Sequence, residues 1–379
     1  MRSSLNSADF RNIFFYISTF YFSFFSIIGV YIIYMPKVLE NIGYSSEEIG
    51  IIFAMSPMVR FLLPFFFLKH LRLTKNIYIS ALGLALFAAV LFYFTIHNFY
   101  LFLLSNIILG ISFALILPYA ETFALEHLGK EKYGKSRLFG SVGFIIVALL
   151  LAKFMNESIN ALHFLFVTIL FTVIFGYKLS FYEKENTADR NNNKNSFSLL
   201  KHWRLWINIF LMQVSFGAFY NFFTIYETAH GVDIETVSYL WTFGVVCEIV
   251  MLYYQGPLLK KNLYNIIKWS TFTAIFRWLL LYFFPDSVLI AYISQSLHAI
   301  TFALYYSAAI AYLFQIYENK KLAQQFFGGI SFGLGGFAGS ILAGIFYGEY
   351  LFLYAAGVAF IAWLILIPIT PATSKDHLA

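Results

Sequence analysis

Apolar stretches of about 20 residues recur along the whole chain, and no other feature limits its possible folds as strongly. A segment of this length spans the hydrocarbon core of a bilayer as a helix. Backbone groups in lipid must pair within their own segment, so we expect helices, and the alternation of a lipid-embedded strand is absent. The chain is 60% hydrophobic and 12% charged, whereas soluble proteins carry about 25% charged residues. These observations exclude a soluble protein.

Twelve such spans can be identified, and they leave room only for short connections in a chain of 379 residues. We therefore predict an all-α membrane protein with twelve transmembrane helices. The predicted spans are residues 12–36, 47–68, 76–96, 99–123, 137–155, 160–182, 203–228, 236–256, 263–283, 287–314, 322–347 and 349–370.

The basic residues predict how these spans are oriented. Of 25 Lys and Arg residues, three are assigned to the membrane interior (Arg60, Arg137 and Arg277), and two lie in or beside loops on one side (Lys37 and Lys153). The other 20 fall on the opposite side, which includes both termini. Basic loops stay in the cytoplasm, so we expect a multi-pass protein of the bacterial inner membrane with both termini cytoplasmic. The net charge of +6 then reflects topology and not nucleic-acid binding.

The longest polar connection, at about 183–201, divides the chain into two halves. It is too polar to be buried and is typical of a flexible cytoplasmic linker. We predict a six-helix bundle at 1–182 and a second at 202–379, in a pseudo-symmetric arrangement.

A weak internal repeat supports that division. Gly29 followed by Gly43-Tyr-Ser-Ser-Glu-Glu-Ile matches Gly217 followed by Gly231-Val-Asp-Ile-Glu-Thr-Val, at an offset of 188 residues. Each half has an even number of spans, so the two repeats run in the same direction. Their pseudo-twofold axis is therefore expected along the membrane normal.

Four segments resemble a known family. They are Tyr133-Gly-Lys-Ser-Arg-Leu-Phe-Gly-Ser-Val-Gly-Phe, Gly43-Tyr-Ser-Ser-Glu-Glu-Ile-Gly-Ile-Ile-Phe-Ala, Tyr239-Leu-Trp-Thr-Phe-Gly-Val-Val-Cys-Glu and Gln295-Ser-Leu-His-Ala-Ile-Thr-Phe. They are similar to segments of the phenylpropionate permease and lactose permease group of the major facilitator superfamily. The resemblance implies a proton-coupled symporter that works by alternating access through a central cavity. Two departures are the loop Phe66-Phe-Leu-Lys-His-Leu-Arg-Leu, which lacks the usual Asp, and Thr301, which replaces an acidic residue.

Ionisable residues inside the spans are the candidate site, because a charge at mid-bilayer costs at least about 2.5–3.5 kcal/mol unless it faces a cavity or a partner. Glu121 and Arg137 are equally far from the connection between the fourth and fifth spans and should lie at one depth. The resemblance implies that they bind substrate. Arg60 maps onto Glu248 under the offset of 188, so it is a further substrate candidate. Glu227 lies at the outer edge of the seventh span.

Glu248, His298 and Arg277 are the candidates for proton coupling. Glu248 has the most apolar surroundings of the span carboxylates and is our first choice for the proton carrier and a substrate ligand. His298 is the second choice because imidazole titrates near neutral pH. We also expect Arg137 and Glu248 to lie close together across the two halves. Packing or a structural ion pair remains an alternative for each.

Four aromatic residues, Tyr31, Tyr34, Tyr220 and Trp241, are candidates for stacking on a planar substrate. Most of the other aromatic residues must pack or face lipid.

The sequence contains no nucleotide-binding loop, metal signature or paired nucleophile and base, so we expect neither an enzyme nor a cofactor. The expected partners are a small-molecule substrate, a proton and the bilayer, with the protein a monomer. The leading function is uptake of a small organic solute such as an aromatic acid, sugar or nucleoside. Proton-driven efflux of drugs or metabolites is the alternative. Na⁺ as the coupling ion also remains open.

Overall fold

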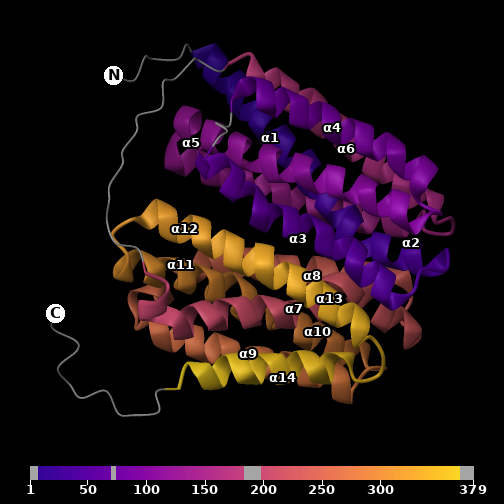
Figure 1. Cartoon of the computed structure of the whole chain (residues 1–379), viewed down its shortest axis with the longest axis vertical. Helices are drawn as coiled ribbons and strands as arrows, with labels where there is room; N and C mark the ends of the chain where they lie inside the picture. Colours follow the sequence, from indigo (N-terminus) through magenta and orange to yellow (C-terminus); the bar gives the residue numbers. More distant parts are fainter. Residues whose placement is uncertain (1–6, 70–73, 183–197, 368–379) are drawn as a thin grey trace.

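A computed structural model describes residues 7–69, 74–182 and 198–367, and every regular element in these ranges is helical. The helices lie side by side and run across the longest axis of the molecule, which is vertical in Figure 1. This confirms the predicted all-α fold class.

The first half of the chain forms six rods. Its elements are α1 (Ser7–Gly29), the π-helix η1 (Val30–Tyr34), α2 (Met35–Asn41), α3 (Ser46–Lys69), α4 (Lys75–Thr95), α5 (Phe99–Ala152) and α6 (Ile159–Ser180). The segments α1, η1 and α2 are one continuous rod. α5 contains two rods, because Gly129 has φ 70° and ψ 169° and reverses the chain there.

The second half of the chain forms six more rods. Its elements are η2 (Leu200–His202), α7 (Trp203–Ala229), α8 (Ile234–Tyr254), η3 (Leu258–Lys260), α9 (Leu263–Phe283), α10 (Val288–Ser296), η4 (Ala299–Leu304), α11 (Tyr305–Ile316), α12 (Lys320–Gly328), η5 (Gly329–Gly335), α13 (Gly336–Ile345) and α14 (Leu351–Ile365). The π-helices η4 and η5 join their neighbours into single rods.

Nine helices within the described residues are long and apolar enough to cross a membrane. The other three rods are α3, α9 and α14. α3 carries Glu47, Glu48 and Arg60, α9 carries Lys268 and Arg277, and α14 has only 15 residues. Each nonetheless continues the up-and-down order. The rods also extend beyond several predicted spans: the first was expected at 12–36 and its rod covers residues 7–41.

The rods alternate in direction, so the bundle has two distinct ends. We call the end at which α1 begins and α14 ends the basal end, and the opposite end the distal end. The rod of α1, η1 and α2 therefore finishes at the distal end, where α14 begins (Figure 1). The connection predicted at 183–201 lies mostly outside the described residues.

The internal repeat recurs in the backbone at the distal end. Gly43 and Gly231 both have positive φ, 99° and 84°, a conformation that glycine adopts without steric cost. Two residues later in each half, a side chain caps the next helix: Ser45 Oγ accepts from the Glu48 amide, and Asp233 Oδ1 accepts from the Thr236 amide. Matching turns thus follow the first and seventh rods.

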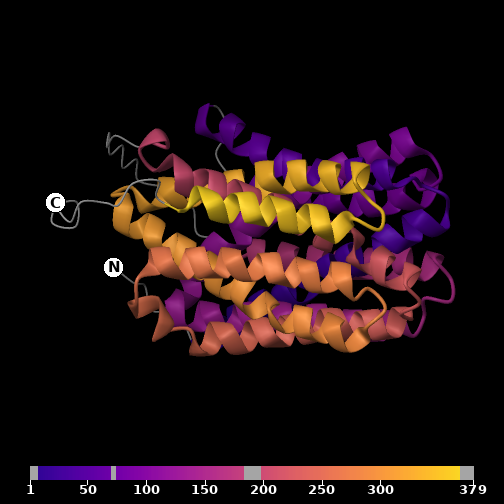
Figure 2. The same cartoon turned by 90° about the horizontal axis from the view of Figure 1, so that it is seen from below.

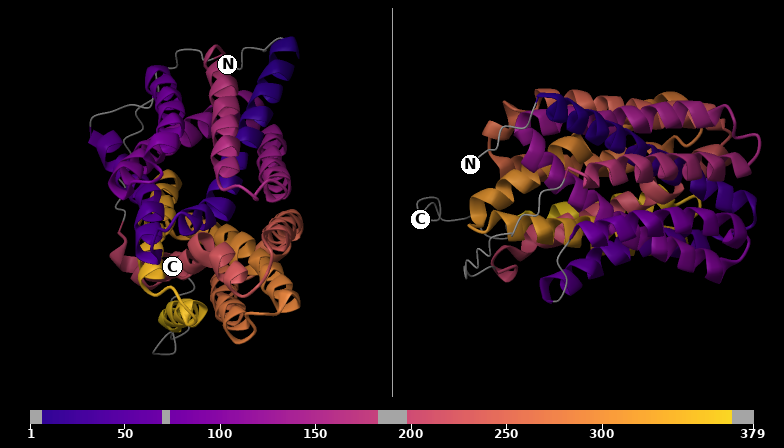
Figure 3. Two further views of the ribbon diagram at one scale, coloured as in Figure 1. Left: turned by 90° about the vertical axis from the view of Figure 1, so that its right-hand side faces the viewer. Right: turned by 90° about the horizontal axis from the view of Figure 1, so that it is seen from above.

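Helices of the first half gather on one side of the bundle and those of the second half on the other (Figure 1 and the left view of Figure 3). Seen from below, the second half lies nearest the viewer (Figure 2). Between the halves, α3 packs along α13 and η5, and α5 packs against α8. The approach of α3 to α13 is close, because a Cβ on Gly50 would lie 2.7 Å from the carbonyl oxygen of Ser340. At the distal end, α2 packs against α7.

Candidate functional site

A cavity of about 650 Å³ lies between the two halves. Its wall includes residues of α1, η1, α3 and α5 from the first half, and of α7, α8, η4 and η5 from the second. This volume falls within the usual range for small-molecule sites, about 300–1,000 Å³.

The cavity extends from the middle of the bundle to its basal end. Glu121, Arg137 and Gln324 line it near the basal ends of their helices, and Gln324 is exposed. At the distal end, the packing of α2 on α7 and of α3 on α13 closes the bundle. The structure therefore represents a state that is open at one end only.

Arg277 of α9 is fully buried behind the cavity wall. Its guanidinium donates to His298 Nδ1 at 3.0 Å, to Thr301 Oγ1 at 3.2 Å and to Gln295 Oε1 at 3.3 Å. It also lies 4.4 Å from the centre of the Phe219 ring. All three hydrogen-bond acceptors are uncharged, so no carboxylate neutralises this cation directly. Thr301, which replaces the expected acidic residue, supplies one of them.

His298 connects Arg277 to Glu248. The Nε2 atom of His298 lies 3.7 Å from Glu248 Oε2, and its ring stacks on Phe302 at 4.9 Å. A guanidinium can only donate hydrogen bonds, so Nδ1 must accept and the proton of the neutral ring must lie on Nε2. The hydrogen-bond network therefore presents an N–H group toward the Glu248 carboxylate.

Glu121 and Arg137 form a second charged group on the opposite wall. Arg137 Nε lies 3.7 Å from Glu121 Oε1, and both side chains are about one third exposed, at 32% and 35%. The guanidinium also lies 3.9 Å from the centre of the Phe25 ring. The two residues thus meet at one depth, as their spacing from the α5 reversal suggested. Arg60 of α3 lines the same cavity.

The direct pairing expected between Arg137 and Glu248 is absent from this conformation. Both residues line the same cavity. However, the Arg137 guanidinium contacts Glu121, and the Glu248 carboxylate contacts His298. Direct contact between them would require the halves to move.

Three of the four aromatic candidates line the cavity: Tyr31, Tyr220 and Trp241. Tyr31 donates to Asn106 Oδ1 at 2.5 Å, and Trp241 Nε1 donates to Thr224 Oγ1 at 3.1 Å. The prediction that Tyr34 lines the cavity is wrong. Tyr34 is fully buried outside the cavity lining, and its hydroxyl donates to the carbonyl oxygen of Ala148.

Uncharged polar residues complete the wall, and the sequence reading missed them. Asn106, Gln213, Asn221 and Gln295 all line the cavity. Each is an amide within an otherwise apolar span. Because burying an unpaired amide is costly, these positions could have been recognised from the sequence as facing a cavity or a partner. Gln213 accepts a hydrogen bond from Tyr306, so this amide also links two helices within the second half.

The described residues contain no group of three or more His, Cys, Asp or Glu side chains able to hold a metal ion. The site is therefore a set of ion pairs, amides and aromatic rings around a cavity. Such a site can bind a solute and exchange protons through its carboxylates.

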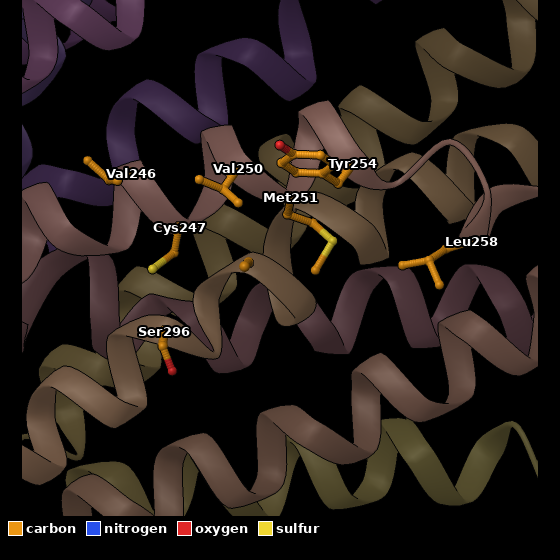
Figure 4. A pocket seen from close by; sticks show the side chains of 8 residues that line it. Val246, Cys247, Val250, Met251, Tyr254, Leu258 and Ser296 are labelled. Atoms are coloured by element: carbon orange, nitrogen blue, oxygen red, sulfur yellow. The ribbon is translucent and has the colours of Figure 1, made fainter.

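A second hollow lies on the outer face of α8 and is unrelated to this site. Val246, Cys247 and Val250 line it together with Ser296 of α10 (Figure 4). Val246 and Val250 are 42% and 51% exposed, on the face of α8 away from Glu248. It is apolar and faces the surroundings of the bundle.

Comparison with known proteins identifies the family. Residues 14–356 match the MFS_1 like family. The probable 3-phenylpropionic acid transporter of Escherichia coli (strain K12) is 24% identical over 376 residues, covering 92% of this chain and 94% of the relative. The quinolone resistance protein NorA of Staphylococcus aureus (strain COL) is 27% identical over 349 residues, covering 86% and 88%.

Solved structures show the same fold. A crystal structure of the nucleoside transporter NupG matches with a TM-score of 0.76 at 15% identity, covering 94% of this chain and 98% of that one. The twelve rods, the cavity between the halves and the family match agree. The chain is a multi-pass integral membrane protein and not an enzyme: it belongs to the MFS_1 like family of major facilitator secondary transporters.

Proposed function

We propose that this protein is a proton-coupled symporter that takes up a small aromatic organic acid by alternating access. The observation that carries the proposal is the buried chain from Arg277 through His298 to Glu248 on one wall of the cavity, opposite Arg137. In this chain the Glu248 carboxylate, which can gain or lose a proton, lies between the buried Arg277 side chain and the solute cavity.

The cavity wall favours a substrate with an aromatic ring and a negative charge. Tyr31, Tyr220 and Trp241 offer ring faces, and Arg60 and Arg137 offer cations. The E. coli relative is named for an aromatic acid, 3-phenylpropionic acid, which has both features.

Coupling is assigned to Glu248 and not to His298. Because His298 Nδ1 accepts from Arg277, a second proton on the ring would have to displace the guanidinium. The Glu248 side chain is 24% exposed, and it accepts no hydrogen bond from Arg277 that a proton would displace. A proton on Glu248 removes a negative charge from the cavity wall, so the proton and an anionic substrate bind cooperatively. Deprotonation at the basal end then restores that negative charge, which repels the anionic substrate and promotes its release.

The side to which the cavity opens follows from the proposed orientation. The basic residues concentrate on the side of the termini, which makes the basal end cytoplasmic. The cavity would then open inward in this structure, and the residues 1–182 and 202–379 would be the two rocking domains. Rocking about the site would expose it alternately to each side of the bacterial inner membrane.

Proton-driven efflux is a second candidate. The likeness to NorA, whose name denotes quinolone resistance, favours it. An antiporter would use the same carboxylate but would bind substrate only after the proton has left. Import and export are therefore distinguished by whether a proton and substrate bind together or compete.

The test is transport by purified protein in liposomes. We expect labelled 3-phenylpropionate to accumulate when the outside is acidic, with a sugar and a nucleoside accumulating much less. A Na⁺ gradient without a pH gradient should drive no accumulation. Accumulation driven by Na⁺ alone would overturn proton coupling. Accumulation when the interior is acidic, in vesicles of known protein orientation, would support efflux instead.

A further inference from the structure

Glu227, near the distal end of α7, is a buried carboxylate without a partner. Its exposure is 1%, and neither carboxylate oxygen has a hydrogen-bond partner. Its backbone carbonyl is satisfied by the Val232 amide, so only the side chain is unpaired. Buried acids nearly always have hydrogen-bond partners, which makes this one unusual.

The position of Glu227 continues the cavity-facing stripe of α7. Gln213 and Tyr220 line the cavity, and Glu227 follows them at the same spacing of seven residues, which returns to one helix face. At 1.5 Å per residue, Glu227 lies about 10 Å beyond Tyr220. It is not part of the cavity wall. The stripe therefore carries it past the cavity into the distal closure, where α2 packs on α7.

Within the described residues, the first half has two lysines at this end, Lys37 on α2 and Lys153 directly after α5, and Lys153 is exposed. Of its charged side chains there, Lys37 pairs with Glu40 on α2 at 2.5 Å. On α3, Glu48 accepts from the Ser45 amide at 2.9 Å, and Glu47 is exposed. Thus neither lysine compensates Glu227: Lys37 already has an acidic partner, and the exposed Lys153 leaves both Glu227 oxygens without a partner.

The described side chains of the second half donate no hydrogen bond to the Glu227 carboxylate either: His230, which caps α7, lies 2.8 Å from the carbonyl oxygen of Tyr226 through its Nδ1. Glu235, in the first turn of α8, accepts from the Tyr239 hydroxyl at 2.5 Å. Asp286, after α9, is exposed, and Tyr226 donates to the carbonyl of Leu281 at 3.3 Å. Neither α13 nor the α14 helix contains an acidic or basic residue.

An ionised carboxylate in these surroundings would be uncompensated, at a cost of several kcal/mol. The neutral acid avoids most of that cost. We propose that Glu227 is a second proton-binding site, separate from Glu248, and that its bound proton holds the distal closure shut. Separation of α2 from α7 would admit water, and the acid could then release its proton to the distal side.

This inference rests on the alternating-access function proposed above. It adds a specific consequence: the closed distal end and the proton on Glu227 stabilise each other, so a rise in pH favours opening of that end. A carboxamide cannot ionise, so Glu227→Gln should remove this dependence while it preserves the side-chain shape.

The experiment measures opening directly, without substrate. Nitroxide labels are attached at Asn41→Cys and Ala229→Cys, two exposed distal positions, in a Cys247→Ser background. Distances between labels are recorded from about pH 5 to about pH 9. In the parent we expect the long-distance population to increase with pH, and in Glu227→Gln we expect the short distance at every pH. Asp286→Asn, an exposed acid at the same end, is the matched control and should behave like the parent.

Two results would overturn the inference: a parent whose distances do not respond to pH, or a Glu227→Gln variant that responds as the parent does. The outcome is separable from the transport proposal. If pH-dependent opening requires Glu227 but liposomes show no proton-driven uptake, the proton site stands and the symport proposal fails. If uptake is proton-driven but opening does not depend on Glu227, the symport proposal stands and the second proton site is rejected.

Discussion

The Nε2 atom of His298 faces the Glu248 carboxylate at 3.7 Å while the opposite nitrogen of the same ring accepts a hydrogen bond from Arg277. The imidazole is thereby fixed as a neutral connector between a buried cation and an acid on the cavity wall. This arrangement assigns different roles to the two groups that the sequence offered as proton carriers.

The first prediction concerns His298 as an acceptor. Glutamine can accept from Arg277 through its oxygen and donate toward Glu248 through its amide, whereas alanine leaves the guanidinium short of a partner. His298→Gln should retain much of the proton-driven uptake, and His298→Ala should lose about tenfold or more, since a hydrogen bond to a charged group contributes about 1.5–3 kcal/mol. Initial uptake rates in liposomes measure both. Equal and complete loss in the two variants would mean that His298 itself carries the proton.

The second prediction concerns Trp241 as a stacking surface. Trp241→Ala should raise the KM for an aromatic acid by about tenfold, because the lost ring contact contributes about 0.5–1.5 kcal/mol beyond the buried area. Trp241→Phe keeps a ring face and should change KM much less. Trp269→Ala removes a tryptophan that is 61% exposed on the outside of the bundle and serves as the control. Unchanged KM in Trp241→Ala would remove this residue from the substrate site.

The third prediction concerns the contact between α7 and α13. A Cβ on Gly217 would lie 2.2 Å from the carbonyl oxygen of Gly339, so a single methyl group forces the helices apart. Gly217→Ala should lower the stability by about 1–3 kcal/mol, as overpacking does. Gly83→Ala is the control, because nothing lies within 4 Å of that Cβ. Thermal unfolding in detergent should show a lower midpoint only for Gly217→Ala.

The fourth prediction concerns topology. With the basic residues on the cytoplasmic side, a reporter active only in the cytoplasm should work when it is fused after residue 190. A reporter active only in the periplasm should work after Asn156, in the distal connection between α5 and α6. The reverse pattern would invert the proposed orientation and place the open end of the cavity on the periplasmic side.

Much of the fold could be predicted from sequence because hydropathy alone encodes it. Nine of the twelve rods within the described residues are long and apolar enough to be recognised directly. The repeat of Gly43 and Gly231 recurs as two positive-φ turns. The depth of Glu121 and Arg137 followed from counting residues around one reversal. Rod ends were less accurate, because helices continue into the polar interface where hydropathy no longer marks them.

The detailed site could not be predicted in the same way. Arg277, His298 and Glu248 come from three rods, and only the packing of those rods decides which side chains meet. Arg137 was expected to meet Glu248, but its nearest acid is Glu121 in the same half. Tyr34 appeared equivalent to Tyr31, three residues away, yet the π-helix between them turns it out of the cavity lining.

The central claim is that Glu248 carries the coupled proton, and comparing net accumulation with exchange in one variant tests it most directly. In liposomes with a pH gradient, Glu248→Gln should fail to concentrate labelled substrate, yet it should still exchange labelled for unlabelled substrate across the membrane. Glu157→Gln, an exposed acid in a distal connection, should accumulate substrate as the parent does. Accumulation by Glu248→Gln that matches the parent under the same gradient would contradict the account.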